Sequence, residues 1–430
     1  MRLSVRAVTL QRVRSGRRLG PCRPLSEVTG PLRGVRVVDL SRVLAGPYCS
    51  QLLGDMGADV IKVEQPGTGD ETRRWGPPFV EGESSYFLSL NRNKRSVAVD
   101  LKNPEGISII KQLVAESDVV IENFLPGKME EFGLSYEALR AINPGVVLCS
   151  ISGFGATGPL SHRPGYDALI SAMYGMLHIT GEEGGGSVKP GVAITDVLTG
   201  LLAHGAVLAA LREKDLTGHG QWVDTSLMEG QLSSLVNIGS NYLTTGQDNS
   251  KRLGTSHPSI VPYQAFKCGD GKEIMICIGS DIQFQVFCGG LGRPELSDSE
   301  LYATNNVRVK NRKDLVTIIE DMLSKHPRDE WLLRFDGLRF PFGPVRSVQE
   351  AFDDPQAQFR QMTVHVKHPK CGTIGMAGPP VKYSRTPLGV RMPPPLLGQH
   401  TTEVLRDVLR LTDEQIKYYH DADAIETSTL

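Results

Sequence analysis

Between residues 32 and 150, short apolar runs alternate with longer amphipathic segments, and this alternation limits the possible folds more than any other feature of the sequence. The runs are rich in valine and isoleucine and predict strands at residues 35–40, 60–63, 96–99, 119–122 and 146–150. The segments between them predict helices at residues 47–56, 104–115 and 135–142. Strands that alternate with helices form a mostly parallel sheet covered on both faces. We therefore expect an α/β protein whose large domain is Rossmann-like.

The rest of the chain predicts a second, smaller domain. An apolar helix is expected over residues 196–213, buried in the core, because its apolar stretch is shorter than the roughly 20 residues a bilayer requires. A short strand at 221–223 and another helix from Asp224 or Thr225 to about Tyr242 should follow. We expect a large domain, a linker helix with a small α+β domain, and a C-terminal segment that returns to the large domain, at residues 31–225, 226–343 and 344–430.

The N-terminus has a different composition from the remainder. Its first 26 residues contain arginines at positions 2, 6, 12, 14, 17, 18 and 23 and no acidic residue. This composition is typical of a mitochondrial transit peptide, although a basic disordered tail has it too. We expect a transit peptide at residues 1–30 and a location in the mitochondrial matrix. The C-terminal Ser428-Thr429-Leu430 lacks the central basic residue of the peroxisomal address.

Charge and cysteine content exclude several classes of function. Lysine and arginine total 47 against 48 acidic residues, which gives no support to a nucleic-acid partner. The seven cysteines are scattered, with no C-x-x-C pair, so neither a disulfide framework nor a zinc site is expected. We predict no bound metal and no permanently bound cofactor.

Ligands of parallel sheets bind beyond the carboxyl ends of the strands, so the loops at those ends are the candidate binding segments. These loops combine glycines, amides and cations, and we place them at residues 41–46, 64–74, 91–95, 123–128 and 152–159. Together they are suited to a phosphorylated nucleotide. The first joint lacks the Gly-x-Gly-x-x-Gly fingerprint, and Pro47 removes an amide there, which argues against a dinucleotide oxidoreductase.

Five segments resemble the class III coenzyme A transferases, of the formyl-CoA transferase and carnitine CoA-transferase type, and the related α-methylacyl-CoA racemases. The resemblance covers nearly everything after residue 32. Its most specific motifs are Asp39-Leu40-Ser41-Arg42-Val43-Leu44-Ala45-Gly46-Pro47, Gly57-Ala58-Asp59-Val60-Ile61-Lys62-Val63-Glu64, Asn91-Arg92-Asn93-Lys94-Arg95-Ser96, Glu122-Asn123-Phe124-Leu125-Pro126-Gly127 and Thr217-Gly218-His219-Gly220-Gln221-Trp222-Val223-Asp224.

The resemblance implies that Asp196 is the covalent nucleophile, because the family uses an aspartate that opens the long helix. Spacing alone favours a different role, that of a helix N-cap. The two roles are compatible, since free amides at a helix start keep a carboxylate ionised and can receive charge that develops on an acyl oxygen. The implied reaction passes CoA between carboxylic acids through an aspartyl anhydride and an aspartyl-CoA thioester.

A racemase or epimerase of acyl-CoA is the alternative. The racemases have a histidine before an aspartate in a Gly-His-Asp string, and the matching string here is Gly165-Tyr166-Asp167. A tyrosine is a poor base at physiological pH, which favours CoA transfer. A third reading, a catalytically silent acyl-CoA-binding protein, stays open.

The resemblance also implies the contacts with CoA. They fall on four segments of the large domain, at Val43 and Leu44, at Val99, Asp100, Leu101 and Lys102, at Asn123, Phe124 and Leu125, and at Ser152, Gly153, Phe154 and Gly155. Arginines that relatives use are replaced by Gln65 and Glu131, which leaves Arg74, Arg92, Lys94 and Arg95 as candidates for the phosphates.

Within the family, the motifs and the basic N-terminus most resemble mitochondrial members that pass CoA from succinyl-CoA to glutarate or similar dicarboxylates. A dicarboxylate needs a donor for its distal carboxylate, and the candidates are Arg42, Arg92, Arg163 and His257. The family also implies an intertwined homodimer.

Overall fold

The computed structural model describes residues 30–427, so the predicted transit peptide lies almost entirely outside the described residues. Its main feature is a seven-stranded sheet in the order β14-β5-β2-β1-β6-β7-β8. All neighbouring strands are parallel except β14, which runs antiparallel to β5. The strands are β1 (Arg36–Asp39), β2 (Asp59–Glu64), β5 (Lys94–Val99), β6 (Val119–Glu122), β7 (Val147–Ser152), β8 (Trp222–Ser226) and β14 (Ile425–Glu426). The predicted α/β class with a large parallel sheet is confirmed.

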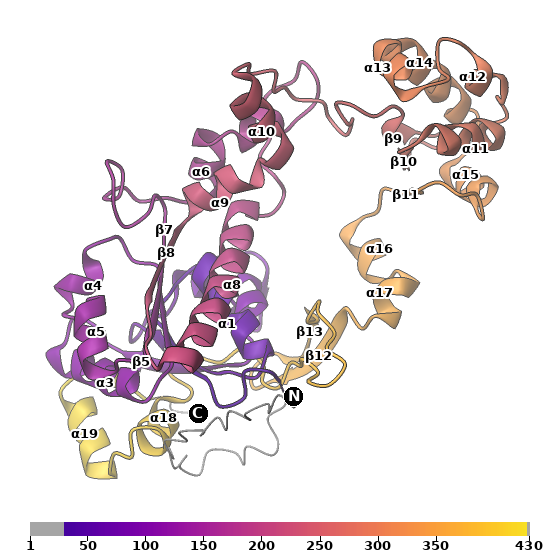
Figure 1. The fold of residues 1–430 in the computed structure, drawn as a ribbon. Helices are drawn as coiled ribbons and strands as arrows, with labels where there is room; N and C mark the ends of the chain where they lie inside the picture. The colour runs from indigo at the N-terminus through magenta and orange to yellow at the C-terminus, as the bar shows by residue number, and fades with distance from the viewer. Residues whose placement is uncertain (1–29, 428–430) are drawn as a thin grey trace, which may run out of the picture.

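Helices cover both faces of this sheet (Figure 1). One face packs against α3 (Pro104–Ala115), α5 (Tyr136–Ile142), α18 (Thr401–Asp407) and α19 (Asp413–Asp421). The other packs against α1 (Ala45–Asp55), α6 (Asp167–Met173), α8 (Ile194–Thr217) and α9 (Leu227–Ser234). Short elements in the connections are η1 (Glu71–Arg74), β3 (Phe79–Val80), β4 (Glu83–Ser84), α2 (Ser85–Leu90), α4 (Lys128–Glu131) and α7 (Met176–Ile179).

The helix α8 is longer and less buried than the sequence predicts. It begins two residues before Asp196, and only one of its faces is buried, packed against α1 and α9. Leu201, Leu202 and Leu216 on its other face are exposed. By length and composition α8 could cross a membrane, a test that the core helix of a globular domain also passes.

The segment after β8 forms two helices instead of the single predicted one. α9 ends at Ser234, and α10 (Val236–Thr245) follows directly. The break falls at Val236, whose φ of 40° is outside the helical region for an L-residue.

The small domain has its own core. It contains the antiparallel strands β9 (Tyr263–Lys267), β10 (Glu273–Cys277) and β11 (Phe342–Pro344), in the order β11-β10-β9. Its helices are α11 (Asp281–Leu291), α12 (Glu295–Asp298), α13 (Asn305–Lys310), α14 (Arg312–Leu323) and α15 (Arg328–Phe335). Phe284, Phe287, Trp331 and Phe335 are fully buried at its centre. Figure 1 shows this domain standing apart from the large one, joined to it by two long connections.

The chain then returns to the large domain. After α16 (Val348–Phe352) and α17 (Pro355–Phe359), the hairpin β12 (Thr363–His368) and β13 (Gly372–Ala377) lies against it. Lys370 Nζ is 3.1 Å from Glu83, and the amide of Asn93 donates to Met392 at 3.1 Å. The C-terminal segment therefore completes the sheet and the helical layer of the large domain.

Candidate active site

The loops after β1, β2 and β6 meet at the carboxyl edge of the sheet. The Asn123 side chain accepts from the Arg42 amide at 2.8 Å and donates to the Arg42 carbonyl at 2.7 Å. The Val43 amide points to both Asp70 carboxylate oxygens, each at 3.3 Å. Val43 has a φ of 70°, a rare conformation for a β-branched residue and one that is found most often at functional sites. Three segments predicted from the sequence to bind a ligand thus lie together.

A buried ionic network supports this edge from beneath. Lys62 Nζ lies 2.9 Å from Asp70 and donates to the Ser41 carbonyl, and Lys94 Nζ lies 3.1 Å from Asp39. All four charged side chains are fully buried. Burial would raise the pKa of Asp39, but Lys94, Lys62 and two serine hydroxyls hold it at about 2. The network fixes the position of the β1 loop.

The loop at residues 91–95 is misplaced by the sequence prediction. Residues 91–93 precede β5 and residues 94–95 begin it, so the segment lies at the amino edge of the parallel sheet. Arg92 is buried against Asp55 at 2.6 Å, and Arg95 pairs with Asp59 at 2.7 Å. Lys94 is enclosed with Asp39 as described above. Internal carboxylates already pair with all three cations, so the structure gives no support to the predicted phosphate contacts at Arg92, Lys94 and Arg95.

Asp196 is the third residue of α8 and does not cap it. The N-cap is Ala193, which has no side-chain oxygen, and Asp167 of α6 accepts the Thr195 amide at 2.8 Å and the Asp196 amide at 3.4 Å. The N-cap interpretation of Asp196 is thus wrong, as is the expectation that free helix amides surround its carboxylate. Asp196 is 9% exposed. Burial raises its pKa to about 7, and the Asp167 carboxylate adds to the increase.

Two residues near Asp196 were not predicted. Burial raises the pKa of Tyr86 to about 12, with contributions from Asp196 and Asp167, so its hydroxyl stays a proton donor at neutral pH. Tyr86 belongs to α2, and its ring stands edge-on to Trp75, with the ring centres 5.2 Å apart. Asp167 was within a motif that the sequence singled out, but only its neighbour Tyr166, which is 63% exposed, was weighed as a catalytic group. Tyr86 carries no recognisable sequence signal.

The segment after β7 is held by tight backbone contacts. The Gly155 amide donates to Ser152 Oγ at 2.8 Å, and the Met228 amide donates to the Gly153 carbonyl at 3.1 Å. A Cβ atom on Gly153 would lie 2.7 Å from Gly165 Cα, so only glycine fits there. The Phe154 ring is buried in the core, which leaves its backbone as the part available to a ligand.

The predicted contacts after β5 lie at the carboxyl edge but are partly covered. Val99 is fully buried, and the Asp100 amide donates to the Ala424 carbonyl at 2.9 Å. Leu101 packs at the rim of the core, whereas Lys102 is exposed. Lys102 is thus the side chain of this group that a ligand can reach.

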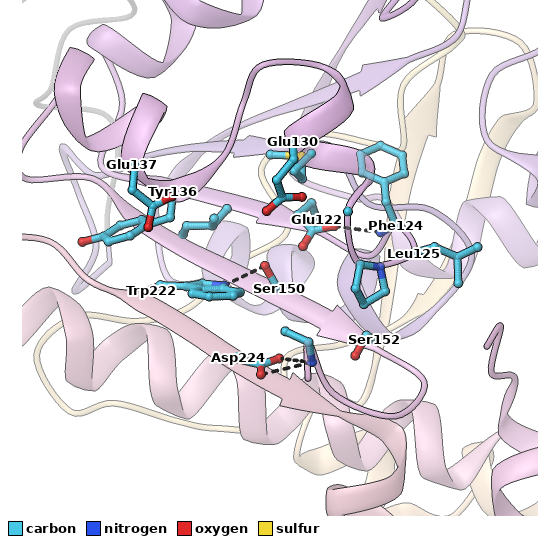
Figure 2. A pocket seen from close by; sticks show the side chains of 15 residues that line it. Glu122, Phe124, Leu125, Glu130, Tyr136, Glu137, Ser150, Ser152, Trp222 and Asp224 are labelled. Carbon is cyan, nitrogen blue, oxygen red and sulfur yellow. Dashed lines mark hydrogen bonds between the residues drawn. The ribbon is translucent and has the colours of Figure 1, made fainter. Parts of the chain in front are cut away.

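A pocket of about 90 Å³ opens beside the ends of β6, β7 and β8 (Figure 2). Phe124 and Leu125 line one side, and the lining also includes Tyr136, Trp222 and four carboxylates, those of Glu122, Glu130, Glu137 and Asp224. Burial raises the pKa of Glu122 to about 7. The volume admits a small group only, and the acidic walls disfavour phosphate.

Within residues 30–427 there is no group of three or more histidine, cysteine or acidic side chains placed to hold a metal ion. The candidate site therefore consists of the carboxyl-edge loops, the buried Asp196 carboxylate, Asp167 and Tyr86.

Known proteins resemble this chain over most of its length. The model of CoA-transferase family III matches residues 32–401. The chain is 48% identical to the succinyl-CoA:glutarate CoA-transferase of Mus musculus, covering 96% of this chain and 95% of that protein. It is 49% identical to the Homo sapiens protein of the same name, with coverages of 93% and 92%. A crystal structure of a CAIB/BAIF family protein from Brucella suis superposes with a TM-score of 0.80 at 41% identity, covering 88% of this chain and all of that one.

Proposed function

The chain belongs to CoA-transferase family III, and from this premise we propose that it moves CoA from succinyl-CoA, or a similar acyl-CoA, to glutarate or a related dicarboxylate. The observation that carries the proposal is Asp196, a buried carboxylate in the first turn of α8. Its place at the helix start matches the position that a covalent nucleophile holds in this family.

The proposed reaction begins when an Asp196 carboxylate oxygen attacks the thioester carbon of the acyl-CoA. The C–S bond breaks, which gives a mixed anhydride and the CoA thiolate. The thiolate then attacks the Asp196 carbonyl carbon, the anhydride C–O bond breaks, and the donor acid leaves as a carboxylate. An acceptor carboxylate attacks the resulting Asp196-CoA thioester, and the same steps run in reverse. Each intermediate keeps enough reactivity for the next transfer.

Ionisation of Asp196 should control the rate on the acid side. Only the carboxylate form is a nucleophile, and burial holds the Asp196 pKa at about 7. The rate should therefore rise as pH increases through about 7. Tyr86, with its pKa raised to about 12, stays protonated and can donate to the acyl oxygen on which charge develops.

CoA is proposed to lie along the carboxyl edge, against Val43 and Leu44, Asn123 to Leu125, Ser152 to Gly155 and Lys102. Its phosphates need accessible cations, and Arg74 and Lys102 are exposed in the two segments concerned. Lys128 at the start of α4 and Arg42 are half-exposed, although each has a carboxylate partner. These four replace the buried Arg92, Lys94 and Arg95 as proposed phosphate partners.

The distal carboxylate of the acceptor is proposed to bind Arg163. Its side chain is exposed, and its guanidinium lies 6.0 Å from the centre of the Phe154 ring, in the segment that leads into Asp167. Among the other candidates, Arg92 is buried with Asp55, Arg42 pairs with Glu71, and His257 lies in the connection to the small domain.

We further propose that the chain acts as an intertwined homodimer in the mitochondrial matrix. Support for the dimer comes from the two long connections that separate the domains and from large apolar side chains exposed on both sides of them. These side chains include Leu201, Leu202, Leu243, Ile282, Leu333, Val348 and Phe359. Support for the location comes from the arginine-rich, acid-free first 26 residues.

The test is to mix protein that lacks the first 26 residues with succinyl-CoA and glutarate, and to follow glutaryl-CoA by mass spectrometry. The Asp196→Ala variant serves as the comparison. Product from the unaltered sequence and none from the variant would support the proposal. Equal product from both would show that Asp196 is not the nucleophile.

Deuterium uptake from solvent at the α-carbon of an acyl-CoA would instead indicate a racemase. The structure offers this reading little support, because Asp167 is engaged by two amides of α8 and Tyr166 stands in the place of the racemase histidine.

A further inference from the structure

The first turn of α8 receives its cap from another helix. A helix start leaves several amides without partners inside the helix, and a serine, threonine or aspartate at the N-cap usually satisfies them. Here the N-cap Ala193 cannot do so. Asp167, the first residue of α6, accepts the amides of Thr195 and Asp196 through the same carboxylate oxygen, Oδ2. Asp167 thus replaces the missing local cap.

This arrangement determines what surrounds the Asp196 carboxylate. A carboxylate in the first turn of a helix is normally stabilised by the free amides of that turn. At α8 the amides of Thr195 and Asp196 are taken, and the Ile194 amide donates to the Val192 carbonyl at 2.9 Å. Across the described part of the chain, the Asp196 carboxylate accepts no hydrogen bond and makes no ion pair. It is a largely buried carboxylate without a hydrogen-bond donor or cation from the described residues, which makes its charged form costly and reactive.

A polar network fixes the cap in place. The Thr195 hydroxyl donates to Gln231 Oε1 at 2.7 Å and lies 2.9 Å from the Ser171 hydroxyl. Gln231 and Ser171 are fully buried and belong to α9 and α6. Three helices are therefore tied together at the point where Asp167 meets α8.

We propose that Asp167 is a positioning residue for CoA transfer: it occupies the first-turn amides of α8, withholds them from Asp196, and so leaves the Asp196 carboxylate poorly solvated and free to attack the thioester. This inference rests on the proposed function, in which Asp196 is the nucleophile. Asp167 itself forms no bond to substrate.

Removal of the Asp167 side chain should have two effects on Asp196. Two amides become available to its carboxylate, and a neighbouring negative charge disappears. Both changes favour the ionised form, so the acid limb of the rate profile should move to lower pH. Both also make the carboxylate a weaker nucleophile, so formation of the Asp196-CoA thioester should slow. Tyr86, the other titratable group that interacts electrostatically with Asp196, keeps its proton throughout this range.

The experiment compares the full chain with Asp167→Ala, Asp167→Asn and Ser171→Ala. Each protein is mixed with excess succinyl-CoA in a single turnover, and the CoA adduct on Asp196 is measured by intact-protein mass spectrometry from pH 5 to 9. The KM for succinyl-CoA and the thermal transition are measured in parallel. Asp167→Asn keeps an acceptor oxygen for the amides but loses the charge. Ser171→Ala removes one hydrogen bond of the network and leaves Asp167 in place.

We expect the acid limb to move down by about one pH unit in Asp167→Ala and by less in Asp167→Asn, which keeps the amides engaged. Adduct formation should slow by about tenfold in Asp167→Ala and less in Asp167→Asn, while KM changes little. Ser171→Ala should keep the acid limb of the unaltered chain, even if its thermal transition falls. If Asp167→Ala does not fold, Asp167→Asn decides the question.

The inference is overturned if the acid limb stays in place in folded Asp167→Asn, or if it moves no further in folded Asp167→Ala than in Asp167→Asn, because the released amides would then have no effect on Asp196. If the unaltered chain forms an adduct, that result leaves the proposed function intact. If the unaltered chain carries no CoA on Asp196, the proposed function is wrong, and the inferred role of Asp167 is wrong as well.

Discussion

Some buried carboxylates in the described part of this chain are paired with a cation, and others are not. Asp39 and Lys94 are both fully buried and lie 3.1 Å apart, so each compensates the other. Asp196 is also buried, but its one charged neighbour of note is another carboxylate, Asp167, and its pKa rises to about 7. The paired charges of Asp39 and Lys94 hold a loop in place, whereas the unpaired carboxylate of Asp196 is a reactive group.

Ionisation of the buried Asp196 carboxylate should lower the stability of the protein. The pKa of Asp196 is about 7 in the folded chain and about 4 when unfolded, so the native state loses stability as pH rises from 4 to 7. Asp196→Asn cannot ionise and escapes this loss. We expect the variant to be inactive and, at pH 8, more stable than the unaltered chain by about 1–3 kcal/mol. Urea denaturation at pH 5 and pH 8 measures the difference, which should grow with pH. A constant or shrinking difference would mean that Asp196 is ionised without cost.

Lys94 should behave as a structural residue. In Lys94→Met the buried Asp39 carboxylate loses the lysine that contacts it and keeps only its serine hydroxyls and the charge of Lys62, so we expect a loss of about 3 kcal/mol in unfolding free energy. The exposed Lys102 is the matched control: Lys102→Ala should leave stability unchanged and raise the KM for succinyl-CoA. Denaturation curves measure the stability of both variants, and initial rates measure their KM for succinyl-CoA. A destabilised Lys102 variant, or a stable Lys94 variant with weaker CoA binding, would reverse these assignments.

Arg163 should determine selectivity for dicarboxylates. Arg163→Gln removes the charge proposed to bind the distal carboxylate, so the KM for glutarate should rise by about tenfold or more. A monocarboxylate acceptor of similar length lacks that group, and its KM should not change. Initial rates with both acceptors provide the measurement. A parallel rise for the two acids would assign Arg163 to CoA binding or to folding.

Helix and strand bounds that depend on neighbouring residues are predicted correctly from the sequence, whereas contacts with residues far along the chain are not. The helix α3 has its predicted bounds because Asn103 caps it and Pro104 follows at the first position. The start of α8 was misread because its cap comes from Asp167, 28 residues away from Thr195. The burial of Arg92 and Lys94 is missed for the same reason: the carboxylates that pair with them, Asp55 and Asp39, lie 37 and 55 residues away.

The close approach of two loops at Gly153 gives a test at this level. A methyl group in Gly153→Ala would meet the Gly165 backbone at 2.7 Å, so the segment that leads to Asp167 must shift. We expect lower stability and an activity loss larger than the stability loss explains. Gly186→Ala is the control, since its added methyl group meets open space. The thermal transitions and specific activities of both variants are measured. Equal values for Gly153→Ala and Gly186→Ala would show that the contact between Gly153 and Gly165 is not needed.

For the whole molecule, the α/β class and the separate small domain follow from the strand and helix pattern, but the exposed apolar surface does not. Leu202 on α8 is 44% exposed and Leu243 on α10 is 81% exposed. Large apolar side chains exposed to this degree are frequent on surfaces that another chain covers. This agrees with the proposed homodimer.

Leu202→Arg should therefore prevent dimerisation. A charge on this face of α8 cannot be buried against a second copy without a large cost, so we expect monomers or aggregates with less than a tenth of the activity. Sedimentation velocity measures the change, and Leu216→Arg, near the end of the same helix, shows how far the interface extends. An active dimer of Leu202→Arg would place the interface elsewhere.

The most direct test of Asp196 as the nucleophile is to identify the residue that carries CoA. The chain is incubated with succinyl-CoA in the absence of an acceptor acid, digested at low pH, and its peptides are analysed by mass spectrometry. We predict a CoA thioester on the peptide that contains Asp196, which disappears when glutarate is added and never forms in Asp196→Asn. A thioester on another carboxylate, or transfer to glutarate with no covalent CoA at all, would contradict the account.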